Sequence, residues 1–144
     1  MKEYRFWGWQ NADIAPINRI YKGIGNPRDL YDALTKAWCP ETCAPRMRSR
    51  WTKDNMTLGQ CAVTAFLAQD IFGGKVYGIL CPGGFYHCYN VVGDCKFDLT
   101  CEQFEGKPLD YANSVEQFRS VHLLMAEKYE RYRTLKTRLR EVTG

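Results

Sequence analysis

The sequence predicts an α+β fold in which a buried helix and a C-terminal helix pack against a small antiparallel sheet. Residues 61–72 are nearly apolar all round, which is typical of a helix buried on every side. Residues 121–142 carry apolar side chains at helical spacing, which predicts a second long helix. Between them lie three β-rich runs separated by glycine-containing turns: 75–80, 85–92 and 95–100.

An aromatic segment, residues 1–28, precedes a single predicted domain that covers residues 29–144. This segment is expected either to dock on the domain as an edge strand or to form a partner surface. In the second case Trp7 and Trp9 would be the natural centre of a homodimer interface, because large aromatic side chains dominate such contacts.

The domain begins with a short predicted helix, Asp29 to Trp38, which ends before Pro40. A polar loop then runs to Thr57. Four cations in this loop are most simply a solvated surface, but they lie close in sequence to the cysteine described next. They could therefore favour an anionic substrate: Arg46, Arg48, Arg50 and Lys53.

Cys61 lies at the predicted start of the buried helix. Thr57 and Gln60 match the capping-box pattern, in which two side chains satisfy free backbone N–H groups of the first helical turn. The positive end of the helix dipole then lies near the Cys61 sulfur and favours the thiolate over the thiol. The thiolate is the form that nucleophilic catalysis requires.

A predicted β-hairpin brings His87 and Asp98 together. Gly93-Asp94 is a two-residue hairpin signal, so Tyr89 should face Asp98, and His87 should face Thr100. Side chains alternate along a strand, and these four therefore share one face of the sheet. His87 and Asp98 become diagonal neighbours within reach of a hydrogen bond.

Two helices are expected after the hairpin, a short one over Ser114 to Ser120 and a longer one over Val121 to Val142. The longer helix ends in three cations that suit the negative end of its dipole: Lys136, Arg138 and Arg140. Together with the loop cations they could serve a small nucleic-acid binder, although a solvated face is the simpler interpretation.

Composition limits the class of protein. The 144 residues suffice for one domain with a sizeable core, and 45% hydrophobic and 25% charged residues are normal for a globular protein. A formal net charge of +4 is mild and does not call for nucleic acid. The charged N-terminus lacks the apolar core of a signal peptide, and no segment reaches membrane-spanning length. We therefore expect a cytoplasmic protein with no membrane partner.

The seven cysteines are expected to be reduced and mostly structural, since nothing indicates secretion and their number is odd. Cys39 and Cys43 have a spacing that zinc ligands can show, but no second pair with matching spacing follows. We therefore expect neither a metal nor another cofactor.

Three motifs, in this chain order, resemble the core of the transglutaminase-like and papain-like cysteine superfamily: Gly59-Gln60-Cys61, His87-Cys88-Tyr89-Asn90 and Phe97-Asp98-Leu99-Thr100. The chain is also similar, over roughly residues 29 to 140, to the uncharacterised bacterial YunG-like family. The resemblance implies a papain-like core whose buried helix carries the cysteine. Tyr89 departs from the superfamily, which usually has Trp at this position.

The same resemblance implies a catalytic triad. Cys61 would be the nucleophile, His87 its base, and Asp98 the group that fixes the imidazole tautomer. The backbone N–H of Cys61 is the natural first donor of an oxyanion hole. Asn55 stands where papain-like enzymes keep an amide side chain, so it is the candidate for the second donor, and Gln60 is the alternative to it. The candidates for the substrate cleft are Trp51, Tyr89 and Asn90.

The predicted activity is thiol-dependent hydrolysis or acyl transfer at an amide, as in a peptidase, a deamidase or a transglutaminase-like enzyme. All three proceed through one thioester intermediate, so the triad does not distinguish them, and the substrate could be a peptide, a protein or a small amide. The alternative is a non-catalytic binding protein that retains the papain-like fold, with Cys61 as an ordinary buried helix cysteine.

Overall fold

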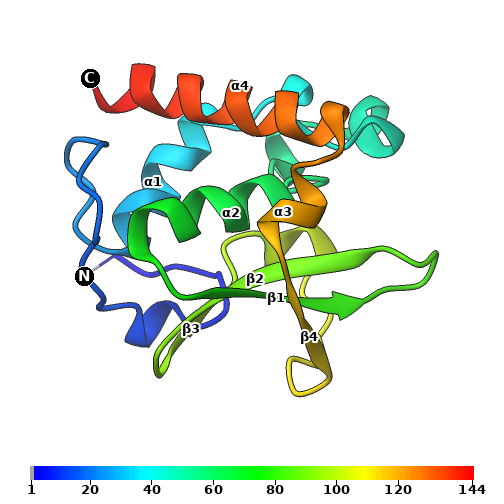
Figure 1. Cartoon of the computed structure of the whole chain (residues 1–144), viewed down its shortest axis with the longest axis horizontal. Helices are drawn as coiled ribbons and strands as arrows, with labels where there is room; N and C mark the ends of the chain where they lie inside the picture. The colour runs from blue at the N-terminus through cyan, green and yellow to red at the C-terminus, as the bar shows by residue number, and fades with distance from the viewer. Residues whose placement is uncertain (1) are drawn as a thin grey trace.

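The computed structural model describes residues 2–144, which form an α+β fold (Figure 1). Helices α1 (Pro27–Ala37), α2 (Cys61–Phe72), α3 (Arg119–His122) and α4 (Ala126–Thr143) combine with strands β1 (Lys75–Leu80), β2 (Tyr86–Val92), β3 (Cys95–Phe97) and β4 (Ser114–Gln117). Short 3-10 helices fill the connections: Trp9–Asn11, Pro40–Thr42, Pro45–Arg50, Lys53–Asn55 and Cys101–Phe104. The loop with four cations is thus largely helical.

Helix α2 occupies the middle of the molecule. It packs against β2 on one side and against α4 on the other, and Figure 1 shows it between the sheet and the long C-terminal helix. Nine of its 12 residues are buried. The nearly uniform apolar character of this stretch follows from burial on both sides, as predicted.

The start of α2 differs from the expected capping box. The helix begins at Cys61, and the Gln60 side chain makes no cap hydrogen bond. Gly59 prevents the helix from starting earlier in the sequence, because its backbone is left-handed (φ 70°). The Thr57 hydroxyl is buried and has no partner among the described residues. Cys61 is consequently the first residue of the helix, closer to its positive end than the capping box would allow.

The sheet has four strands in the order β3-β2-β1-β4, and all its pairings are antiparallel. Asn90 faces Phe97, and Val92 faces Cys95, which confirms the register set by the Gly93-Asp94 turn. Strand β3 is shorter than predicted and ends at Phe97. Asp98 instead forms an isolated antiparallel bridge with Trp7 of the N-terminal segment.

The prediction of a helix over 114–120 is wrong. Residues 114–117 form β4, which pairs with the free edge of β1, so that Gly78 faces Val115. Pairing with a strand far away in sequence outweighs local helix preference here. The helix predicted from Val121 is also divided, since α3 ends at His122 and the extended backbone of Met125 (φ −76°, ψ 115°) precedes α4.

The N-terminal segment packs on the body of the protein. Phe6 is fully buried, and the Trp7 carbonyl accepts a hydrogen bond of 2.9 Å from the backbone N–H of Asp98. The Trp7 ring stacks on Tyr111 with 3.7 Å between ring centroids. The segment therefore covers the end of the hairpin that carries Asp98.

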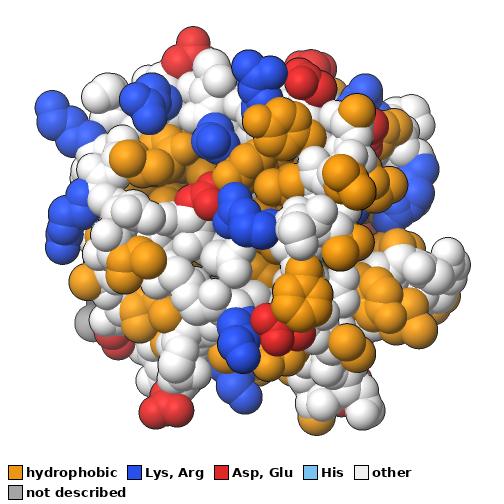
Figure 2. All heavy atoms as spheres, viewed as in Figure 1, with side chains coloured by type: hydrophobic (Ala, Val, Ile, Leu, Met, Phe, Trp, Pro, Cys, Tyr) orange, Lys and Arg blue, Asp and Glu red, His pale blue; other side chains and the backbone are white. Residues whose placement is uncertain are grey.

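The molecular surface carries dispersed charge on the face drawn in Figure 2, where Lys and Arg side chains are spread among apolar and neutral ones.

All seven cysteines are free thiols. In residues 2–144, no group of three or more His, Cys, Asp or Glu side chains is arranged to hold a metal ion. None of the described helices combines the length and apolarity that crossing a membrane requires.

Candidate active site

Asp98 lies at the centre of a buried hydrogen-bond network. Its Oδ2 accepts from Nε2 of His87 at 2.6 Å and from the Tyr111 hydroxyl at 2.8 Å. Its Oδ1 accepts from the backbone N–H of Thr100 at 3.2 Å. Three donors around a fully buried carboxylate fix its orientation.

His87 is held between Asp98 and Cys61. Nε2 is engaged by Asp98, and the ring packs edge-to-face on Phe104 at 4.8 Å. Burial disfavours a charged ring, but the charge and hydrogen bond of Asp98, together with Cys61, raise the pKa of His87 to about 10. The ring is therefore an imidazolium at neutral pH.

The Cys61 thiol has a pKa well below its ordinary value. A hydrogen bond from the Cys88 thiol contributes most, and the hydrogen bond and charge of His87 add to it, while burial opposes both. The pKa of Cys88 moves well above its ordinary value, because of its interaction with Cys61 and its burial. The carbonyl oxygen of Tyr86, 3.8 Å from the sulfur, can accept only from the protonated thiol. The lowered pKa of Cys61 and the raised pKa of His87 both favour a thiolate–imidazolium pair.

Cys61 is partly exposed and lines a pocket of about 230 Å³. His87 and Asp98 lie behind the pocket wall and are fully buried. A small ligand can therefore reach the sulfur, while the His87 and Asp98 side chains have no contact with solvent. Low local polarity strengthens the hydrogen bonds of such a network.

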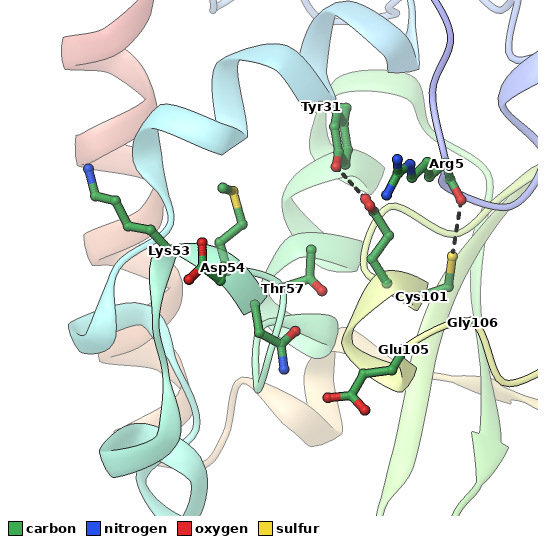
Figure 3. A pocket seen from close by; sticks show the side chains of 11 residues that line it. Arg5, Tyr31, Lys53, Asp54, Thr57, Cys101, Glu105 and Gly106 are labelled. Carbon is green, nitrogen blue, oxygen red and sulfur yellow. Dashed lines mark hydrogen bonds between the residues drawn. The ribbon is translucent and has the colours of Figure 1, made fainter.

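Asn55, the candidate for the second donor of the oxyanion hole, does not line this pocket. It lines a larger cavity of about 510 Å³ together with Arg5, Tyr31 and Thr57 (Figure 3). None of Cys61, His87 and Asp98 lines that cavity. Although it is the larger of the two, it holds no part of the predicted triad.

Gln60 and the three candidates for the substrate cleft also lie away from the pocket. Gln60 is fully buried, and its Nε2 donates to the carbonyl of Cys39 at 3.1 Å. Trp51 donates a hydrogen bond to the carbonyl of Met56. Tyr89 is buried, and its hydroxyl forms a hydrogen bond with Ser114. Asn90 links β2 to α2 by donating to the Ala65 carbonyl. These interactions give structural roles to Gln60, Trp51, Tyr89 and Asn90.

Gln103 supplies the amide that sequence reasoning did not select for this site. It lines the Cys61 pocket, and its Oε1 accepts from the backbone N–H of Gly59 at 3.3 Å. Its Nε2 donates to the Thr100 carbonyl at 3.0 Å and lies 3.5 Å from Nδ1 of His87. One feature of the sequence could have identified Gln103: it follows Thr100 by three residues and therefore comes shortly after Asp98.

Comparison with known proteins identifies relatives but no activity. The YunG protein family matches residues 26–144. The uncharacterized protein YunG of Bacillus subtilis (strain 168) is 38% identical over 63 residues, which are 44% of this chain and 53% of that protein. The chain thus spans about half the length of this curated relative. No solved structure matches the chain.

Proposed function

The chain belongs to the YunG family, and we propose that it is a thiol-dependent hydrolase or acyltransferase that acts on an amide. Cys61 is the nucleophile, His87 the general base and acid, and Asp98 the group that orients His87. This arrangement corresponds to a papain-like or transglutaminase-like catalytic core, the assignment suggested by its three sequence motifs.

One observation carries the proposal. The buried His87 ring is engaged by Asp98 through Nε2 at 2.6 Å, and its interaction with Cys61, the first residue of α2, lowers the pKa of that thiol. A nucleophile bonded to a base, which is in turn oriented by a carboxylate, is the general signature of an activated nucleophile. A purely structural cysteine needs no such partner.

The proposed reaction has two balanced halves. The Cys61 thiolate attacks the amide carbonyl carbon, the C–S bond forms, and the C–N bond breaks as His87 gives its proton to the leaving amine. Water or an amine then attacks the thioester and passes a proton to His87, and the C–S bond breaks to restore the thiolate.

Two N–H groups are suited to the negative oxygen of the tetrahedral intermediates. The backbone N–H of Cys61 belongs to the first turn of α2, where N–H groups have no acceptor within the helix. The Gln103 amide is the second, because it lines the same pocket. Loss of one such donor typically slows the reaction about 100-fold or more.

An activated ester tests the proposal without knowledge of the substrate. Mixing the protein with p-nitrophenyl acetate should release a burst of p-nitrophenolate equal to the protein concentration, with the acetyl group on Cys61 by peptide mass spectrometry. Cys61→Ser should abolish the burst, and His87→Ala should slow it by about 100-fold. Adding a primary amine should speed acetyl loss in an acyltransferase but not in a strict hydrolase.

Acetylation spread evenly over lysines and other cysteines would contradict the proposal. Cys95 is a suitable internal reference, because it is also a free and partly exposed thiol. If Cys61 acquires acetyl groups no faster than Cys95, the protein is better regarded as a binding protein that retains the fold without the chemistry.

A further inference from the structure

The pocket at Cys61 has an excess of positive charge. Four basic residues line it, and no Asp or Glu among residues 2–144 does so: the basic residues are Arg46, His122, Lys128 and Arg131. With the carboxylate of Asp98 counted, the triad carries one net negative charge. One cation of the lining therefore suffices to balance it.

Arg131 does not contribute free charge to the pocket. It is buried, and its Nε donates to both carboxylate oxygens of Glu127, at 3.0 and 2.7 Å. One of its terminal nitrogens also donates to the Thr42 carbonyl at 3.3 Å. Its charge is thus compensated within the protein.

Lys128 is oriented by a chain of side chains. Its Nζ lies 2.8 Å from Nδ1 of His122, whose Nε2 lies 2.8 Å from Oε1 of Gln117. Burial and the charge of Lys128 lower the pKa of His122, so the ring is neutral and accepts at Nδ1 while it donates from Nε2. The ammonium group retains further N–H donors, and none of the described carboxylates forms an ion pair with it.

Lys128 is also close to the reactive sulfur. Burial lowers its pKa, and the charges at Cys88 and Cys61 act in the opposite direction. The interaction of the ammonium with both sulfurs is consistent with its place in the lining of the Cys61 pocket. A group bound to Lys128 would therefore lie beside the atom that attacks.

Arg46 provides a second uncompensated cation on the exposed side of the pocket. Its guanidinium lies over the Phe85 ring, 4.1 Å from the centroid, and Phe85 also lines the pocket. Stacking holds the guanidinium plane and leaves its edge N–H groups free to bind a carboxylate. Within residues 2–144 no ion pair involves Arg46.

We propose that the substrate carries a carboxylate close to the amide carbonyl that Cys61 attacks, and that Lys128 and Arg46 bind this carboxylate. The inference deepens the proposed function and rests on it. Lys128 supplies a compact charge inside the pocket, and Arg46 supplies paired N–H donors. The carboxylate of an Asp or Glu side chain and that of a chain end offer the same chemistry.

Two alkylating agents of similar size provide the test, iodoacetate with a carboxylate and iodoacetamide without one. The rate of Cys61 modification by each is measured at pH 7 and normalised to the same cysteine in the denatured chain. The normalised rate for iodoacetate should exceed that for iodoacetamide by about tenfold, because a field of one sign concentrates the oppositely charged reagent.

Substitutions of Lys128 and Arg46 test whether these two residues cause the preference of Cys61 for iodoacetate. Lys128→Gln and Arg46→Gln should each reduce the ratio of the iodoacetate rate to the iodoacetamide rate several-fold, because this ratio cancels any change in the reactivity of Cys61 itself. Lys136→Gln is the matched control, since it removes the same charge from the same helix but lies outside the pocket. Equal preferences in Lys128→Gln and Lys136→Gln would overturn the inference.

The outcomes separate the two proposals. Fast modification of Cys61 by iodoacetamide without a preference for iodoacetate refutes the carboxylate site and leaves the proposed function standing. Slow modification by both reagents refutes the proposed function itself. Protection of Cys61 by N-acetylglutamate α-amide assigns a side-chain carboxylate, whereas protection by N-acetylalanine assigns a chain end.

Discussion

His87 Nε2 lies 2.6 Å from Asp98 Oδ2, and neither side chain has any exposed surface. An isolated pair of buried charges would be costly, but this one is embedded in further hydrogen bonds from Tyr111 and Thr100. We propose that this pair supports the reactivity of the Cys61 sulfur.

Replacing Asp98 by Asn tests this dependence. The amide removes the negative charge and can place an NH₂ group where only acceptors stood, so the pKa of His87 should fall and the Cys61 thiolate should lose support. We expect iodoacetamide labelling of Cys61 at pH 7 to slow by about tenfold or more. The free energy of unfolding should fall by about 1–3 kcal/mol.

Tyr111→Phe is the control for Asp98→Asn, because it removes one donor to Asp98 but leaves the charge. It should lower stability by about 1 kcal/mol with little change in labelling. An Asp98→Asn protein that stays folded and labels Cys61 at the wild-type rate would show that Asp98 has only a structural role in the hairpin.

The pH dependence of stability should reveal the thiolate–imidazolium pair. His87 has a raised pKa, so its contribution is complete below the ordinary value of 6.5 and is lost as pH rises towards about 10. Cys61 has a lowered pKa, so its contribution is complete above the ordinary value of 9.0 and is lost as pH falls through its folded pKa.

Together these two contributions make the unfolding free energy independent of pH over a limited range. Below pH 9.0, and above both 6.5 and the folded pKa of Cys61, the folded and unfolded chains bind equal numbers of protons at these two groups, so their joint contribution is constant. The difference in unfolding free energy between wild type and His87→Gln, from urea denaturation, should be flat in this range and decrease on both sides. A difference that changes steadily across this range would contradict an ion pair.

Cys88 is predicted to act as a hydrogen-bond donor to Cys61. Cys88→Ala removes the donor, so the pH midpoint of Cys61 labelling should shift upward. Cys88→Ser retains a donor at the same place and should restore most of the wild-type midpoint. If the Ala and Ser variants shift the midpoint equally, Cys88 acts through packing and not through its thiol proton.

Gly59 is predicted to be essential for the position of Cys61. Its φ is +70°, and a Cβ atom would lie 2.5 Å from the Cys43 sulfur. Gly59→Ala should cost about 3 kcal/mol or more of unfolding free energy, measured in urea. Gly23→Ala is the control, since Gly23 has a similar φ of +82° and open space around it. It should cost only about 1–2 kcal/mol, and equal losses would show that the contact is unimportant.

Local patterns predicted the parts of the fold that depend on neighbouring residues. The Gly93-Asp94 turn fixes the register that places His87 beside Asp98, because a two-residue turn leaves the strands little choice. The burial of helix α2 and its end at Phe72 were predicted, since burial on both sides leaves an unmistakable apolar run, whereas its start at Cys61 differs from the capping box expected at Thr57.

Contacts between distant segments account for what was missed. Residues 114–117 have a helix-like composition but complete the edge of β1. Gln103 reaches the Cys61 pocket only because the chain turns back after Asp98. The ring of Trp7 stacks on Tyr111, far away in sequence. Such pairings depend on the assembled tertiary structure, which a single sequence does not specify locally.

The most direct test of the account is the pH dependence of iodoacetamide labelling at each cysteine of the folded protein, read by mass spectrometry. We predict that Cys61 alone labels rapidly near pH 7, with a rate that changes little up to pH 9, because its thiolate is already formed. Cys95 and Cys101 are also partly exposed, but burial raises the pKa of both, so their labelling should be slow and rise with pH. A Cys61 that labels no faster than Cys95 at pH 7 would contradict the account.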